Sequence, residues 1–157
     1  MSRAFVKEHD DTDSVEEFVD RPISSFRNLV TASGLKQIET QIAEHRTAYG
    51  KAAAALDKAA TAKASRDLRY WIARRTSAEL IAPPKNSDVI RFGMSVTIER
   101  QNGQRQTFRI VGEDEADPKQ GLLSYVSPLA RELLGKGHGD VLAVSYTHLT
   151  LPTNREV

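Results

Sequence analysis

Apolar residues recur at alternating spacings of three and four over the first half of the chain, which is the repeat of a helix packed against another helix. The first run of seam positions is Leu35, Ile38, Ile42, His45, Tyr49, Ala52 and Leu56. The second run is Ala64, Leu68, Trp71, Arg75 and Ala78. Two such helices joined by a short connection predict an antiparallel helical hairpin, a coiled coil over residues 31–82. The symmetry of the two runs places its turn near Leu56, Asp57 and Lys58, or nearer Gly50 if the two arms are unequal.

The pattern changes after residue 90 to the alternation of apolar and polar residues that is typical of half-buried strands. Residues 90–100 alternate in this way, Asn102-Gly103 is a hairpin turn signal, and residues 107–111 predict the returning strand. Shorter strands are expected at 122–126 and 141–144. Ser127 and Pro128 fit the N-cap and first position of a helix. The expected fold class is therefore α+β, with the hairpin followed by a small antiparallel sheet domain carrying one helix.

Prolines and changes in composition mark the boundaries between these parts. Two prolines in the segment 83–89 predict a linker between the hairpin and the sheet domain at 90–144. Residues 1–30 have no sustained hydrophobic period, which predicts a disordered acidic tail and linker. The segment 145–157 lacks the pair of alternating strands expected there, and it looks like foreign sequence at the end of a chimeric reading frame.

Charge is unevenly distributed, although the formal net charge is only +1. Residues 8–20 contain seven acids and no Lys or Arg, whereas residues 32–81 contain nine bases and five acids, a charge of +4. The plainest interpretation is a solvated tail and a solvated helix surface; association of the tail with the hairpin is the alternative. The basic residues of the second helix predict at most weak or indirect contact with nucleic acid; these are Arg66, Arg69, Arg74 and Arg75.

Other classes are disfavoured by what the sequence lacks. It contains no cysteine, which excludes disulfides and thiolate metal sites, and it has no apolar run of the ~18 residues needed to span a membrane. A cytoplasmic monomer is expected. No phosphate-binding glycine loop, zinc-protease motif or nucleophile elbow is present, so we expect no enzyme, cofactor or metal.

Two sets of residues invite a metal-binding hypothesis. The acidic cluster Glu113, Asp114, Glu115 and Asp117 carries oxygen ligands that suit Mg²⁺ or Ca²⁺, but it lacks the spacing of an EF-hand loop. The favoured interpretation is a solvated turn that positions the next strand. His45 lies on the helical seam, where a structural role is expected.

One long stretch also resembles a known family. The run V-G-E-D-E-A-D, followed after a short gap by S-Y-V-S-P-L-A-R-E-L-L-G-K, resembles the C-terminal domain of the GreA/GreB transcription elongation factors. The likeness covers residues 90–144, and a weaker one covers 28–81. It implies an FKBP-like domain that binds the rim of the secondary channel of bacterial RNA polymerase core. The binding corner that it implies is Ser124, Tyr125, Val126, Ser127 and Pro128.

The hairpin tip departs from that family. Its members carry two acids in a motif like G-D-L-x-E-N-A-E-Y, which help to hold a catalytic Mg²⁺ in the polymerase. Here the expected tip residues are Lys51, Asp57 and Lys58, with Asp57 the only acid. One carboxylate between two bases is a poor Mg²⁺ ligand set, so we expect no efficient stimulation of transcript cleavage.

The leading hypothesis is thus a Gre-family factor that binds RNA polymerase and regulates elongation through the secondary channel. Two alternatives stay open. One is an FKBP-like prolyl isomerase, for which Phe92, Phe108 and Tyr125 are the available aromatic residues. The other is a coiled-coil adaptor with no role at a polymerase.

Overall fold

The computed structural model describes residues 19–144 and 147–150, which divide by their contacts into two units. Of the described residues, the first unit comprises 19–25 and Ile38–Ser77, and the second comprises Phe26–Gln37, 78–144 and 147–150. The helix α2 (Ala32–Ala54) contributes residues to both units, and α3 (Lys58–Ser77) belongs to the first. The two units are described separately.

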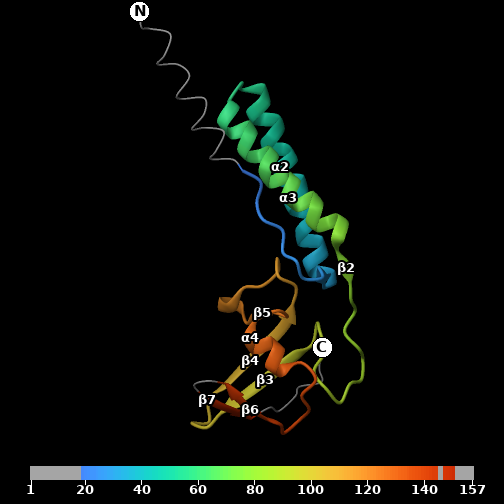
Figure 1. The fold of residues 1–157 in the computed structure, drawn as a ribbon, viewed down its shortest axis with the longest axis vertical. Coiled ribbons are helices and arrows are strands. Elements are labelled where there is room, and N and C mark those ends of the chain that lie inside the picture. Colours follow the sequence, from blue (N-terminus) through green and yellow to red (C-terminus); the bar gives the residue numbers. More distant parts are fainter. Residues whose placement is uncertain (1–18, 145–146, 151–157) are drawn as a thin grey trace, which may run out of the picture. The chain divides into compact units, whose positions relative to one another are not determined.

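The first unit is the predicted helical hairpin, in which α2 and α3 run side by side (Figure 1). A three-residue turn joins them, and Leu56 takes a positive φ of 54° there. Two hydrogen bonds of Asp57 stabilise the turn. Its N–H donates to the carbonyl of Ala52 at 3.0 Å, and its carboxylate accepts from the N–H of Ala60 at 3.1 Å. The turn lies where the two hydrophobic runs predicted it.

The seam between the helices is only partly the predicted one. Ile38, Ala52 and Ala64 are buried, but Tyr49 and Leu56 near the turn are exposed. The prediction that Arg75 lies on the seam is wrong, because Arg75 is exposed and pairs with Glu39 at 3.1 Å.

Two charged residues occupy the seam of α3 in its place. Asp67 and Arg74 are buried, and they follow Ala64 with Trp71 between them at the helical spacing of three and four. The run predicted from apolar residues was therefore displaced by one position at two places, with Asp67 and Arg74 buried where Leu68 and Arg75 were expected.

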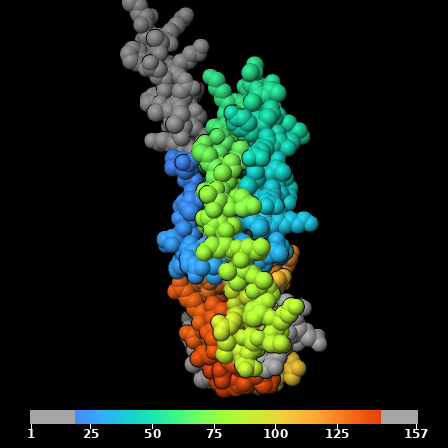
Figure 2. Space-filling view, turned by 90° about the vertical axis from the view of Figure 1, so that its right-hand side faces the viewer, coloured from blue at the N-terminus to red at the C-terminus, as the bar shows by residue number. Residues whose placement is uncertain are grey.

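Residues 19–25 have defined positions along α3, although the sequence placed them in a disordered tail. The Asp20 carboxylate accepts a hydrogen bond from Arg69 at 2.8 Å, and the Arg21 guanidinium lies 3.8 Å from the centre of the Tyr70 ring. Figure 2 shows this segment in blue against the green of α3. Of the tail and linker predicted at 1–30, residues 1–18 lie outside the described residues, and Leu29 and Val30 form a strand.

The second unit contains a five-stranded sheet in the order β5-β4-β3-β7-β6. The strands are β3 (Ser95–Arg100), β4 (Arg105–Val111), β5 (Leu122–Ser124), β6 (Val141–Val144) and β7 (Thr147–Thr150). The hairpin predicted at Asn102-Gly103 joins β3 to β4, with Val96 opposite Phe108. The confirmed fold is thus a helical hairpin with a small α+β sheet domain.

Two details of this sheet differ from the prediction. β5 pairs with β4 in parallel, because the loop carrying the 3₁₀ turn η1 (Pro118–Gln120) returns the chain to the same end of the sheet; the sheet is therefore mixed. β7 forms an antiparallel pair with β6 in the segment expected to lack strands. The remainder of that segment, residues 145–146 and 151–157, lies outside the described part of the chain.

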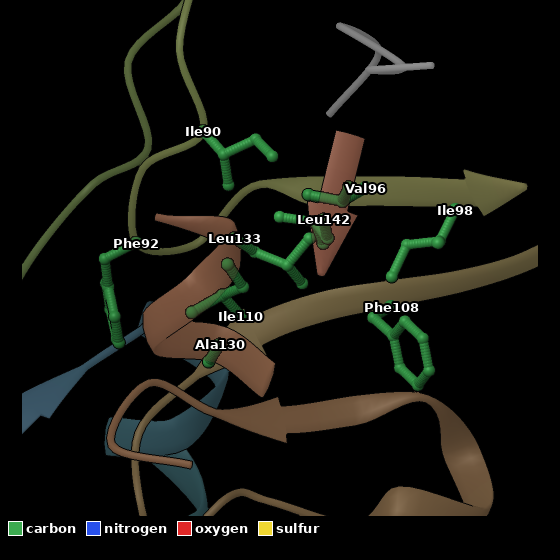
Figure 3. Close-up of a cluster of buried hydrophobic side chains, with 9 residues drawn as sticks. All are labelled: Ile90, Phe92, Val96, Ile98, Phe108, Ile110, Ala130, Leu133 and Leu142. Atoms are coloured by element: carbon green, nitrogen blue, oxygen red, sulfur yellow. The ribbon is translucent and has the colours of Figure 1, made fainter. Parts of the chain in front are cut away.

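The core of the second unit gathers between the sheet and the short helix α4 (Pro128–Leu133) (Figure 3). The alternation predicted this core correctly, because the residues that β3 and β4 contribute to the cluster are every second one; Val111, beside Ile110, is buried as well. The cluster is Ile90, Phe92, Val96, Ile98, Phe108, Ile110, Ala130, Leu133 and Leu142. No helix in the described residues is both long and apolar enough to cross a membrane.

A second, two-stranded sheet adds the ends of the hairpin sequence to this unit. β1 (Leu29–Val30) and β2 (Glu79–Leu80) are parallel, and the Glu79 N–H donates to the Asn28 carbonyl at 2.8 Å. Gly112, which follows β4, lies against this ribbon so closely that a Cβ there would meet the Leu29 carbonyl oxygen at 2.3 Å. Only glycine fits at this contact.

We expect Gly112→Ala to destabilise the protein by about 1–3 kcal/mol, because backbone on both sides must move to admit one methyl group. The free energy of unfolding in urea, followed by circular dichroism, measures the effect. Gly50→Ala is the matched control: nothing lies within 4 Å of its added Cβ, and removing a glycine from a helix interior stabilises by about 1 kcal/mol. Equal stability of the Gly112→Ala variant and the unmodified protein would contradict the tight contact.

Candidate functional site

The corner between β5 and α4 is built by short-range hydrogen bonds. The Ser127 N–H donates to the Ser124 carbonyl at 3.0 Å, and the Ser127 hydroxyl accepts from the Ala130 N–H at 3.3 Å. Pro128 occupies the first turn of the helix, where a missing N–H leaves no bond unmade. The corner is therefore a rigid helix cap, as the sequence predicted from local chemistry alone.

Tyr125 has a structural role in this corner. Its ring meets Phe92 edge to face with 5.7 Å between centroids, and its hydroxyl donates to the Arg27 carbonyl. Its N–H also donates to the Val111 carbonyl at 2.9 Å. Tyr125 thus ties the segment before β1 to the sheet.

The five corner residues differ in how many of their side chains are held by packing or hydrogen bonds. Tyr125 packs on the core cluster, and Ser124 accepts a bond from the Val126 N–H at 3.4 Å. The Val126 side chain is half-buried and is not among the side chains packed on that cluster. Of the five predicted binding residues, Val126 and the exposed Pro128 are therefore the two whose side chains a partner reaches most directly.

The acidic loop after β4 holds the start of α2. The Glu115 carboxylate accepts from the hydroxyl of Thr31 and, at 2.8 Å, from that of Ser33. Thr31 also caps the helix, accepting from the Gly34 N–H at 3.0 Å. A Cβ on Gly34 would lie 2.7 Å from Glu115 Oε1, so glycine gives the carboxylate room at the helix end. A negative charge at a helix N-terminus is favourable.

Sequence reasoning missed this contact, because Glu115 lies 82 residues or more from Ser33 and Thr31 in the chain. Asp117 in the same loop caps η1, accepting from the Lys119 N–H at 3.2 Å. The acidic cluster is thus a framework loop. Among the described residues no three His, Asp or Glu side chains come close enough to hold a metal ion.

An exposed ion pair joins the two strands of the small ribbon. Arg27 donates twice to the Glu79 carboxylate, each bond 3.0 Å long. The hydrogen bond from Arg27 lowers the pKa of Glu79, so the pair contributes at neutral pH and is lost as pH falls through that lowered pKa. Because both groups are exposed, the contribution is small.

The hairpin tip places its one acid in a helix cap. Asp57 accepts from the Ala60 N–H, while the exposed Lys51 and Lys58 flank the turn. Beside the turn a hollow of about 470 Å³ opens between the two helices. Its lining residues are Tyr49, Ala53, Leu56, Lys58, Thr61, Ala62 and Ser65.

A buried acid organises the middle of the hairpin. Asp67 accepts from Arg66 at 3.0 Å, and it lies 3.6 Å from Arg21 and 3.8 Å from the imidazole of His45. His45 also bonds through Nδ1 to the Gln41 carbonyl at 2.6 Å. Both His45 contacts are within the hairpin, which agrees with the structural role expected of a seam histidine.

Comparison with known proteins places the sheet domain in a family. Residues 84–150 match the family model described as "Transcription elongation factor, GreA/GreB, C-term". A transcription elongation factor GreA of Anaeromyxobacter sp. (strain K) is 46% identical over 79 residues, which are 49% of this chain and 46% of that protein. A GreA of Cereibacter sphaeroides is 50% identical over 68 residues, which are 43% of this chain and 45% of that protein.

The sheet domain is thus similar to the C-terminal domain of the GreA/GreB transcription elongation factors. The matched region spans less than half of the two curated relatives. Among solved structures, the Gfh1 protein of Thermus thermophilus aligns over 82% of this chain and 98% of its own, with 19% identity and a TM-score of 0.39. A similarity at that level supports no conclusion about function.

We expect Glu115→Gln to loosen the start of α2, because the amide replaces one of the two accepting oxygens by an NH₂ group and carries no charge for the helix end. The start of α2 should lose stability on the order of 1–2 kcal/mol. Faster amide hydrogen exchange at residues 34–38, measured by NMR, would report it. Glu132→Gln, at an exposed position on α4, is the matched control. Unchanged exchange in the Glu115→Gln variant would show that the bonds to Thr31 and Ser33 contribute nothing.

Proposed function

We propose that this protein binds bacterial RNA polymerase core at the rim of the secondary channel and regulates transcription elongation, acting in the cytoplasm as a monomer. The observation that carries the proposal is the match of residues 84–150 to the GreA/GreB C-terminal domain. The relatives that share this domain are named as transcription elongation factors. The corner from Ser124 to Pro128 is the proposed contact.

The geometry of the corner supports that assignment. A partner-binding surface gains affinity when its residues are held in place before binding. The cap at Ser127 and the bonds of Tyr125 fix the backbone there, which leaves Val126 and Pro128 presented on a rigid turn. Tyr125 acts in this proposal by positioning its neighbours.

The tip supports regulation without stimulation of transcript cleavage. A hard cation such as Mg²⁺ needs charged oxygen ligands. The tip offers the Asp57 carboxylate, which caps α3, beside the ammonium groups of Lys51 and Lys58. We therefore propose that the protein is not itself an enzyme and that it supplies no metal ligands to the polymerase. Contact with nucleic acid would be weak or indirect.

The alternative of a prolyl isomerase is less well supported. Such a site needs an open pocket lined with aromatic side chains. Phe92 and Phe108 belong to the buried core cluster, and the Tyr125 hydroxyl is bonded to the backbone of Arg27. The adaptor alternative accounts for the hairpin but not for the family match of the sheet domain.

We expect the full chain to bind RNA polymerase core in biolayer interferometry and Val126→Asp to weaken the binding about tenfold, equivalent to about 1.4 kcal/mol. A charge at a buried interface position without a partner is unfavourable. Val141→Asp, at an exposed valine on β6, is the matched control. Absence of binding by the unmodified chain would contradict the proposal, and equal effects of the two substitutions would contradict the assignment of the corner.

We expect arrested elongation complexes to show no faster transcript shortening with the protein than without it, in Mg²⁺-containing buffer. The physical reason is the single, capping carboxylate at the tip. Asp57→Asn should leave the result unchanged, since Asn also caps helices well. Efficient Mg²⁺-dependent cleavage that Asp57→Asn abolishes would contradict the assignment while leaving polymerase binding intact.

A further inference from the structure

Phe26 and Arg131 form an exposed pair on the second unit, beside the corner between β5 and α4. The Arg131 guanidinium lies 5.1 Å from the centre of the Phe26 ring, a distance at which a cation is attracted to an aromatic face. Both side chains reach solvent, and 47% of Phe26 is exposed. Because Phe26 precedes β1 and Arg131 lies on α4, folding is needed to bring the two together.

Two observations place this pair next to the corner. Pro128 and Arg131 are three positions apart on α4 and both are exposed, so they lie on one face of that helix. The Tyr125 hydroxyl donates to the Arg27 carbonyl, which ties the residue after Phe26 to the corner. Pro128, Arg131 and Phe26 therefore form one continuous exposed surface, the Phe26–Arg131 surface.

Arg131 is the residue of this surface whose positive charge is available to a partner. The nearby Arg27 donates two bonds to the Glu79 carboxylate, so its charge is matched within the chain. In the part of the chain that the structure describes, Arg131 forms no ion pair. The next residue, Glu132, lies about 100° further round the helix and so leaves the face that carries Arg131.

A guanidinium held over an aromatic ring is well suited to binding a carboxylate. Its N–H donors lie at the edge of the group, where they can bind both carboxylate oxygens at once. The ring also restricts the long Arg side chain before binding, which reduces the conformational entropy lost when a partner arrives. Aromatic residues and Arg are enriched among the side chains that dominate the energy of protein interfaces.

We propose that the Phe26–Arg131 surface is part of the contact with RNA polymerase core. In this contact the Arg131 guanidinium binds a carboxylate side chain of the polymerase, and the exposed part of Phe26 packs on an apolar side chain beside it. The inference rests on the proposed polymerase binding and extends that contact beyond the corner. Val126 and Pro128 supply apolar area, whereas Arg131 supplies the charge that selects an acidic partner.

Biolayer interferometry of the full chain with polymerase core free of nucleic acid tests this inference. We expect Arg131→Ala to weaken binding about tenfold, mainly through faster dissociation, because loss of a charge pair enclosed in an interface acts on the dissociation rate. Arg131→Lys should recover part of the loss, since an ammonium group keeps the charge but cannot form the bidentate bond. Phe26→Ala should also speed dissociation. The double variant should lose less than the two single effects combined, because the two residues act as a pair.

Arg100→Ala is the matched control, because it also removes one exposed guanidinium that has no ion pair among the described residues. Its guanidinium bonds instead to the amide oxygen of Gln106 at 3.3 Å. Arg100 ends β3 at the turn into β4, whereas Val111, whose carbonyl accepts from Tyr125, ends β4 at the opposite end of the strand. The separation along the strand is about 20 Å. The control should leave the dissociation rate unchanged.

The outcomes separate this inference from the proposed function. Absence of binding by the unmodified chain would overturn both. Weakening by Val126→Asp without any effect of Arg131→Ala would leave the polymerase contact standing and overturn this inference alone. Equal effects of Arg131→Ala and Arg100→Ala, confined to the association rate and lost in high salt, would also overturn it, because they would show long-range attraction in place of a bound carboxylate. Urea unfolding followed by circular dichroism should be the same for Arg131→Ala, Arg131→Lys and the unmodified chain.

Discussion

The bond between Glu115 and the first turn of α2 is the interaction on which the second unit depends. It joins the loop after β4 to residues more than 80 positions earlier, and it does so where a helix N-terminus favours a negative charge. Gly112 and Tyr125 support the same joint, one by close approach to Leu29 and the other by its bond to Arg27. The start of α2 is consequently part of the sheet unit rather than of the hairpin unit.

Because of this contact, the structural unit is larger than the region that matches the family. The matched residues begin at 84, whereas the unit that contains them also includes Phe26–Gln37 and residues 78–83. Glu115, in the acidic run that carries the family likeness, therefore contacts a segment outside the matched region. A domain boundary taken from the sequence alone would separate Glu115 from Thr31 and Ser33.

Local patterns were sufficient for most of the fold because they report on neighbours in the sequence. The alternation of Val96 and Ile98 identified buried strand positions, and Ser127 with Pro128 identified a helix start. The seam of α3 was predicted less well, since the pattern search followed apolar residues and the buried positions there are Asp67 and Arg74. Asp67 is paired with Arg21 and His45, and pairing between residues far apart in the sequence leaves no periodic signal.

In the candidate site, too, features set by neighbouring residues were predictable and features set by distant residues were not. The corner could be located from sequence because its cap is local, but Tyr125 could not be assigned to positioning without its distant partners Phe92 and Arg27. At the tip, the sequence could not show that the Asp57 carboxylate caps a helix. Asp57 accepts from the Ala60 N–H through one oxygen, and a single carboxylate between two ammonium groups is a poor ligand set for a divalent ion. Charge at this tip is therefore net positive, which favours an acidic partner over a divalent cation.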